Sequence, residues 1–118
     1  MRLDCYVYGR NLVARPVGEL DLSVADRFRI QLERHLAAGG VKNLVLDLSR
    51  VSFIDSSGLG VILGRYRRLR ALGGEVAIVN PSPSVNRLLI LAGLHRLVRF
   101  YGSEEEALGS LERGSGDE

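Results

Sequence analysis

Short apolar runs alternate along this chain with longer segments whose apolar residues recur at helical spacing, and this alternation restricts the fold more than any other feature. The runs of strand length lie at 44–48, 51–54, 75–79 and 97–100. Glycine pairs at 39–40 and 73–74 end two of the helical segments. Strands that alternate with helices predict an α/β domain whose sheet is covered by helices.

The N-terminus predicts a hairpin. Residues 3–8 and 12–17 have the composition of strands, and Gly9-Arg10-Asn11 between them suits a tight turn. The later strands are joined by helices, which favours parallel pairing, so the sheet is expected to be mixed. The short apolar run at 44–48, broken only by Asp47, indicates a strand that is buried on both faces and therefore central.

About four helices are expected to pack against this sheet. The first begins at Val24 with Ser23 as its N-cap. The second spans 56–72, where apolar residues recur at helical spacing up to the glycine pair. Prolines mark the start of the third at 81–83.

The fourth helix closes the predicted domain. Ser103 and Glu106 have the spacing of a capping box, and the helix is expected to run through Leu111. Residues 114–118 are expected to form a flexible tail. A length of 118 residues with 46% apolar content suits one core, so a single domain is predicted for residues 1–113.

Composition excludes several kinds of protein. Sixteen basic against 14 acidic residues leave a net charge of only +2, which gives no reason to expect nucleic acid as a partner. Cys5 is the single cysteine, so neither an intramolecular disulfide nor a paired-cysteine metal site is expected. The longest apolar stretch, 88–94, is too short to cross a membrane, and we expect a cytoplasmic protein without a membrane partner.

The segment Asp-Ser-Ser-Gly-Leu-Gly at 55–60 stands where a buried strand is expected to turn into a helix. One interpretation is that Asp55 or Ser56 caps the helix, a role worth about 1 kcal/mol. The other is that a serine hydroxyl accepts a phosphate there, because helix N-terminal N–H groups and the macrodipole stabilise negative charge. The two roles can coexist.

Helical geometry predicts a smooth strip on this second helix. At 100° per residue, Ser57, Gly60 and Gly64 lie together and are flanked by Arg67 and Arg68. Exposed glycines in a helix cost about 1 kcal/mol each relative to alanine. The strip therefore indicates either a docking surface that needs close backbone approach or tight packing against a neighbouring loop.

Signatures of other functions are absent from this region. The third glycine of the series 58, 60 and 64 comes one residue late for a dinucleotide-binding fingerprint. No glycine stands two residues before Ser56 or Ser57, as a hydrolase nucleophile elbow requires. His35 and His95 stand apart without a catalytic pattern around them. We therefore expect no enzymatic activity.

Two further features are candidates for parts of a site. Four arginines at 65, 67, 68 and 70 lack a second basic cluster or an aromatic platform, which favours a face directed to solvent or to an acidic partner over nucleic acid. Asp21, which ends the turn at 18–21, is a candidate to approach Asp55 and form a carboxylate pair near Ser56.

The chain resembles the STAS domain family of sulfate transporters and anti-sigma factor antagonists from about Leu3 to Leu111. The segments that carry the resemblance lie at 18–21, 53–66, 73–75 and 92–94. In the antagonists of that family, the serine directly after the aspartate is phosphorylated by an anti-sigma factor that is itself an ATP-dependent kinase. The resemblance implies that Ser56 is the acceptor and Ser57 only its neighbour.

The resemblance also implies a function. By this resemblance, the unphosphorylated protein binds the anti-sigma kinase and releases its sigma factor to activate sporulation transcription, and a metal-dependent serine phosphatase reverses the modification. ATP or ADP is expected on the kinase, with no cofactor on this chain, which is expected to be monomeric when free. The residues assigned to partner binding are Asp21, Asp55, Ser57, Gly58, Gly60, Gly64, Arg67 and Arg68.

Other functions remain open on the sequence. An antagonist that serves general stress would share the Ser56 switch and differ in the sigma factor it releases. A constitutive STAS module, which supports a transporter or senses a small ligand, would use Ser56 only as a cap. An enzyme would show turnover without any partner.

Overall fold

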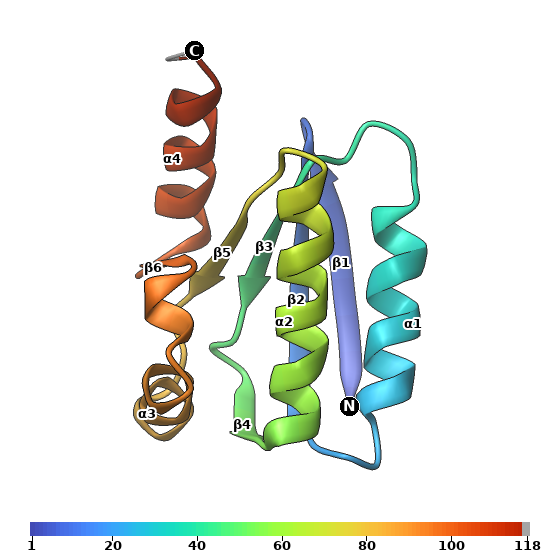
Figure 1. Ribbon diagram of the computed structural model, residues 1–118, viewed down its shortest axis with the longest axis vertical. Helices are drawn as coiled ribbons and strands as arrows, with labels where there is room; N and C mark the ends of the chain where they lie inside the picture. The colour runs from blue at the N-terminus through green and yellow to red at the C-terminus, as the bar shows by residue number, and fades with distance from the viewer. Residues whose placement is uncertain (117–118) are drawn as a thin grey trace.

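A mixed sheet of six strands forms the centre of the domain in the computed structural model, which describes residues 1–116 and the side chains of residues 1–113 (Figure 1). The strands are β1 (Arg2–Tyr8), β2 (Asn11–Leu20), β3 (Asn43–Asp47), β4 (Val51–Ile54), β5 (Val76–Val79) and β6 (Arg99–Tyr101). The order β1-β2-β3-β5-β6 is antiparallel in its first pair and parallel thereafter. The predicted hairpin and the central position of β3 are both confirmed.

β2 differs from the prediction in a way that places the functional region. The strand does not stop at residue 17 but continues to Leu20, where a turn was expected. Its register shifts between Gly18 and Glu19, and Gly18 has a φ of +108°, which favours glycine. The first part of β2 pairs with β3, and the last part, which contains this shift, pairs with β4, so that Leu20 lies opposite Ile54.

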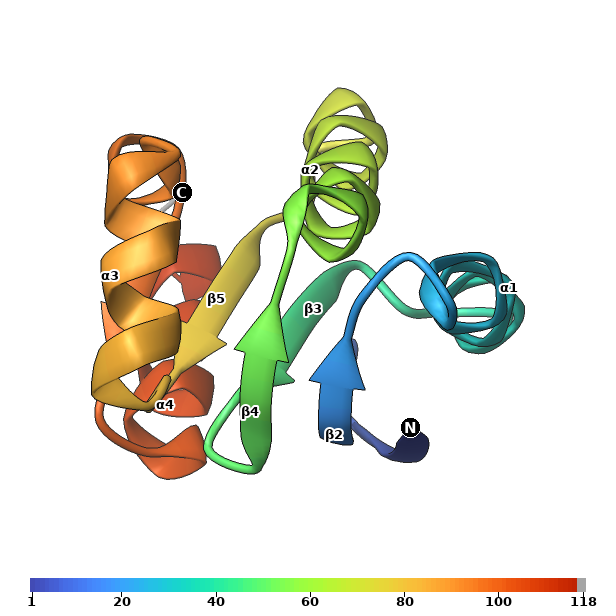
Figure 2. The ribbon, with the colours of Figure 1, turned by 90° about the horizontal axis from the view of Figure 1, so that it is seen from below.

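Helices cover both faces of the sheet (Figure 2). They are α1 (Ala25–Leu36), α2 (Ser56–Ala71), α3 (Pro83–Leu91) and α4 (Glu104–Gly116), with a short 3₁₀ turn, η1, at Leu94–Arg96. Side chains of β2 alternate between the two faces: Leu12 belongs to the core cluster that contains residues of α1, α2 and α3, whereas Val13 belongs to the cluster that contains residues of α4. The main core therefore lies under α1, α2 and α3, and a smaller one lies under α4.

Several predicted boundaries need correction. Ser23 is not the N-cap of α1: that position is Val24, which makes no side-chain cap, and the Ser23 hydroxyl donates to Asp21 Oδ1 at 2.6 Å. The last strand begins at Arg99 and not at Leu97, because the N–H groups of Leu97 and Val98 bind the Leu94 carbonyl in the turn that follows η1. Helix α4 continues to Gly116, so the residues expected to be tail are helical as far as the structure describes them, and 117–118 lie outside the described residues.

The start of α4 is tied to the sheet by a charged cluster. Arg15 donates two hydrogen bonds to the Glu104 carboxylate, at 2.7 and 2.6 Å, and the Tyr6 hydroxyl donates a third at 3.0 Å. The hydrogen bonds from Arg15 lower the pKa of Glu104 to about 2. Burial, and then hydrogen bonding to Glu104, raises the pKa of the neighbouring Asp47. The cluster fixes α4 across the second face of the sheet.

Glu104→Gln is expected to lower the free energy of unfolding by about 1 kcal/mol at pH 7, since it removes the charge from a two-point arginine contact. A carboxylate whose pKa is depressed on folding stabilises the protein above its unfolded pKa near 4.5, and this contribution declines as the pH falls toward 2. Urea titrations at pH 7 and pH 3 should therefore show the difference shrinking at the lower pH. Asp4→Asn, in an exposed ion pair with Arg2, is the control that should change little at either pH.

Candidate functional site

Asp55 organises the junction between β4 and α2. It is the N-cap of α2, and its Oδ1 accepts hydrogen bonds from the N–H groups of Ser57 at 2.8 Å and Gly58 at 3.1 Å. Its Oδ2 accepts a third from the N–H of Leu22, at 3.0 Å, in the loop between β2 and α1. One carboxylate thus fixes the start of the helix and a loop more than 30 residues earlier. Of the two capping candidates, Asp55 is the cap.

Ser56 is the first residue of α2, and its side chain is exposed. Within the described part of the chain, its hydroxyl makes no hydrogen bond, since the capping role belongs to Asp55. The hydroxyl is therefore accessible at the positive end of a 16-residue helix, where negative charge is stabilised. Ser57, in contrast, is half-buried.

The three glycines of α2 have different surroundings. Gly58 is buried, and a methyl group there would overlap the carbonyl oxygen of Leu20 and meet the side chain of Ile54. Its lack of a side chain is thus explained by close packing between α2 and β2, and Gly58 offers no surface to a partner. Gly60 and Gly64 have open space where a methyl would lie, and Gly60 is exposed. The predicted strip therefore has open space at both of its glycines, whereas Gly58, which was assigned to partner binding apart from the strip, is packed inside.

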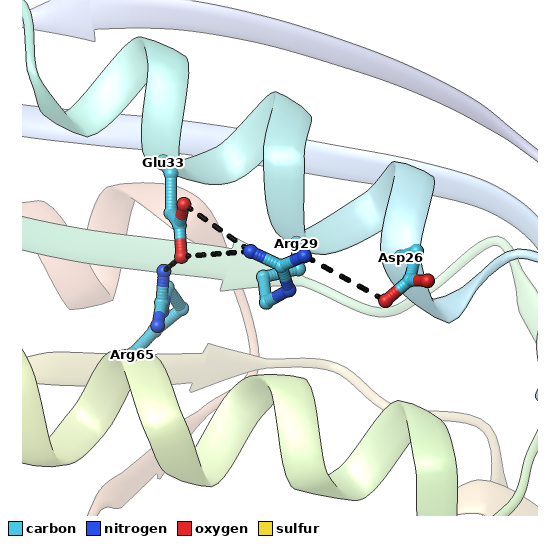
Figure 3. A network of polar contacts seen from close by, with 4 residues as sticks. All are labelled: Asp26, Arg29, Glu33 and Arg65. Carbon is cyan, nitrogen blue, oxygen red and sulfur yellow. Dashed lines mark hydrogen bonds and ion pairs between the residues drawn. The ribbon is translucent and has the colours of Figure 1, made fainter.

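The arginines of α2 also separate into two groups. Arg67 and Arg68 are exposed, as the predicted basic edge requires. Arg65 is only 9% exposed and forms an ion pair with Glu33 of α1, which also binds Arg29 (Figure 3). The hydrogen bond from Arg65 lowers the pKa of Glu33. The burial of Arg65 could have been predicted from the sequence, because residue 65 is four residues before Leu69 and therefore lies on the same, buried face of the helix.

Asp21 does not form the expected carboxylate pair through its own side chain. Its Oδ1 accepts hydrogen bonds from the N–H of Ser23 at 3.0 Å and from the Ser23 hydroxyl, which lowers the pKa of Asp21. Asp55 reaches the same loop at the backbone of Leu22 instead. The two acidic segments are brought together, but by a backbone hydrogen bond.

Two exposed apolar side chains adjoin Ser56 and were not identified from the sequence. Leu22, in the loop held by Asp55, is 76% exposed, and Phe53, two residues before Asp55 on β4, is 44% exposed. Both are candidates for contact with a partner, since contiguous exposed apolar surface is typical of sites that bind other proteins. For Leu22, the available signal was an apolar residue between a strand and a helix, flanked by Asp21 and Ser23.

A search against known families matches the STAS domain over residues 2–107. The chain belongs to the STAS domain family. Within the described residues, this STAS domain has no helix long and apolar enough to cross a membrane, and no group of three or more side chains suited to hold a metal ion.

Relatives of this STAS domain are named as anti-sigma factor antagonists. The anti-sigma F factor antagonist of Paenibacillus polymyxa is 42% identical over 101 residues, 86% of each chain. The anti-sigma-B factor antagonist of Listeria monocytogenes is 32% identical over 93 residues, 79% of this chain and 81% of that one.

Solved structures show the same fold. The anti-sigma factor antagonist SpoIIAA in its unphosphorylated form has a TM-score of 0.82 and 32% identity, over 94% of this chain and 96% of that one. The phosphorylated form of SpoIIAA from Bacillus has a TM-score of 0.73 and 32% identity, over 92% and 98%. The single α/β domain predicted from the sequence is therefore confirmed.

Asp55→Ala is expected to lower the free energy of unfolding by about 1–2 kcal/mol, because it removes the cap of α2. It also frees the Leu22 N–H, whose hydrogen exchange should become faster relative to amides in β3. Urea unfolding and hydrogen exchange measured by NMR test both effects. Asp55→Asn keeps an acceptor oxygen and should lose much less stability; equal losses in the two variants would contradict the capping argument.

Proposed function

We propose that this STAS domain is an anti-sigma factor antagonist that is inactivated by phosphorylation of Ser56. The observation that carries the proposal is the exposed Ser56 hydroxyl at the N-terminus of α2, with no hydrogen bond inside the described chain. The names of its relatives support the class of protein. The existence of SpoIIAA in unphosphorylated and phosphorylated forms supports the modification.

In the proposed cycle, the unphosphorylated chain binds an anti-sigma factor that is also a serine kinase, and a sigma factor for sporulation is released. ATP and ADP bind to the kinase, and this chain carries no cofactor and catalyses no reaction. A metal-dependent serine phosphatase restores the active form. The cycle operates in the cytoplasm, with neither nucleic acid nor membrane as a partner, and the free antagonist is a monomer.

The physical basis of the switch is charge at the docking surface. A phosphate adds about −1.5 to −2 charges at neutral pH. On Ser56 it would stand directly beside the Asp55 carboxylate, whose oxygens already bind the Ser57, Gly58 and Leu22 amides. Desolvating both negative groups against a partner costs free energy, so binding weakens without a change of fold.

The proposed docking surface surrounds Ser56 and extends along α2. It includes the open positions of Gly60 and Gly64, the basic edge at Arg67 and Arg68, and the exposed Leu22. Ser57, Asp21 and Asp55 shape it from the helix start and the adjoining loop, while Gly58 contributes through packing. An apolar anchor with small residues and a basic edge suits a partner with a complementary acidic rim.

A second candidate is an antagonist for general stress, favoured by the similarity to the Listeria protein. It would use the same Ser56 switch, and the sigma factor released from the kinase distinguishes the two. A constitutive STAS module, with Ser56 free of any modification, is the third.

Phosphosite mapping tests the proposed function directly. The chain is incubated with the anti-sigma kinase of the same genome and ATP, and its intact mass and phosphopeptides are compared with those of Ser56→Ala. One added phosphate that disappears in Ser56→Ala is expected. A phosphate that persists in Ser56→Ala would move the site, and the absence of any phosphate would favour the constitutive module.

A further inference from the structure

A groove lies between α1 and α2 at the end of α2 that is remote from Ser56. Its volume is about 380 Å³, within the range of small-molecule sites. The apolar part of its wall consists of Ala37 and four larger aliphatic residues, Leu36, Val41, Leu69 and Leu72. Leu72 is 77% exposed at the rim, so the groove presents aliphatic surface to solvent. These four residues have no part in the proposed Ser56 switch.

Arg65 lies in this groove with most of its hydrogen-bonding capacity unused. A guanidinium group carries five N–H donors. Within the described chain, Arg65 makes one hydrogen bond, from Nη1 to Glu33, and its buried Nε has no partner. Buried polar groups are nearly always paired, and leaving them unpaired costs free energy. The Arg65 side chain thus has hydrogen-bond donors for which the described residues provide no acceptor.

The charges around the groove favour an anion. Arg65 and Arg68 both line it, against the single carboxylate of Glu33. Glu33 also pairs with Arg29, so its negative charge is shared between two guanidinium groups. Arg68 is exposed and makes no hydrogen bond or ion pair among the described residues. The groove therefore combines an aliphatic wall with a positive end.

We propose that this groove binds a small amphipathic anion, a carboxylate that carries a short aliphatic chain. The carboxylate would accept hydrogen bonds from Arg68 and from free donors of Arg65, a geometry that guanidinium groups favour. The aliphatic chain would lie against Leu36, Val41, Leu69 and Leu72 and bury the exposed part of Leu72. This site does not use Ser56, but it shares Arg68 with the basic edge of the proposed docking surface.

Titration of the isotope-labelled full chain with sodium octanoate, followed by NMR, tests the proposal. Saturable shifts are expected in the methyl signals of the four aliphatic residues. Acetate, which has the head group without the chain, and octyltrimethylammonium, which has the chain with a positive head, should not produce them. Arg68→Gln should weaken octanoate binding about tenfold or more. Arg70→Gln, an exposed arginine on the same helix outside the groove, is the matched control and should bind normally.

Each other outcome overturns the proposal. Shifts that never saturate, or that fall outside the groove, would remove the site. If octyltrimethylammonium bound as tightly as octanoate, the arginines would not be selecting an anion. The same conclusion would follow if Arg68→Gln bound octanoate with the affinity of the wild type. Methyl shifts that follow protein concentration without octanoate would assign the groove to a second copy of the chain. The Ser56 phosphorylation assay is unaffected by any of these results.

Discussion

Ser56→Asp is expected to weaken binding to the anti-sigma kinase about 100-fold, while Ser56→Ala keeps the affinity of the unmodified chain. The substituted carboxylate would stand next to Asp55 at the centre of the proposed surface, and two neighbouring negative charges would have to lose their water on docking. Alanine at the same position removes only an exposed hydroxyl that caps nothing, so the fold and the surface are retained. Calorimetry or interferometry with the purified kinase measures both affinities.

Ser84→Asp is the matched control for this experiment. Ser84 is an exposed serine in the first turn of α3, so aspartate there adds the same charge at another helix N-terminus. It should bind the kinase like the wild type. If Ser56→Asp and Ser56→Ala bound equally well, the charge-based switch would be wrong; if Ser84→Asp weakened binding as much as Ser56→Asp, the effect would be one of net charge and not of position.

The fold was predictable where local patterns and tertiary packing agree. Residues 44–46 are apolar because both faces of β3 are covered, Leu44 and Leu46 in the main core and Val45 in the smaller core under α4. The period of α2 is clear because one side packs on the sheet. The prediction failed where a long-range partner decides. Gly18 signalled a turn, yet pairing with Val51 of β4 keeps the strand extended beyond it.

The site was predictable in the same uneven way. A serine after an aspartate at a helix start could be located from the sequence, since capping and exposure are local properties. The roles of Gly58 and Arg65 depend on neighbours 32 or more residues away in the chain, the carbonyl of Leu20 and the carboxylate of Glu33. From the sequence, both residues were therefore grouped with exposed residues of the same type. Leu22 was missed because its exposure depends on a long-range hydrogen bond. Its backbone N–H donates to the Asp55 carboxylate, and this holds the loop with the Leu22 side chain exposed.

Gly58→Ala and Gly60→Ala are expected to change the free energy of unfolding in opposite directions, although the two glycines lie only half a turn apart on α2. A methyl group on Gly58 would overlap the Leu20 carbonyl, which accepts the Asp55 N–H at 3.3 Å, and backbone cannot yield as a flexible side chain would. The expected loss is about 3 kcal/mol in the free energy of unfolding, at the upper end for added volume in a packed site. Gly60→Ala meets no atom and should gain about 1 kcal/mol from helix propensity.

Kinase binding separates the two glycines further. Because Gly60 is exposed one turn from Ser56, its methyl would hold a partner away from the backbone of α2, and Gly60→Ala should bind at least tenfold more weakly despite its higher stability. Urea unfolding and the binding assay on the same three proteins make the comparison. A stable Gly58→Ala would refute the packing argument for that residue. A Gly60→Ala variant with wild-type affinity would confine the docking surface to the start of the helix, since the glycine strip would then serve no close approach.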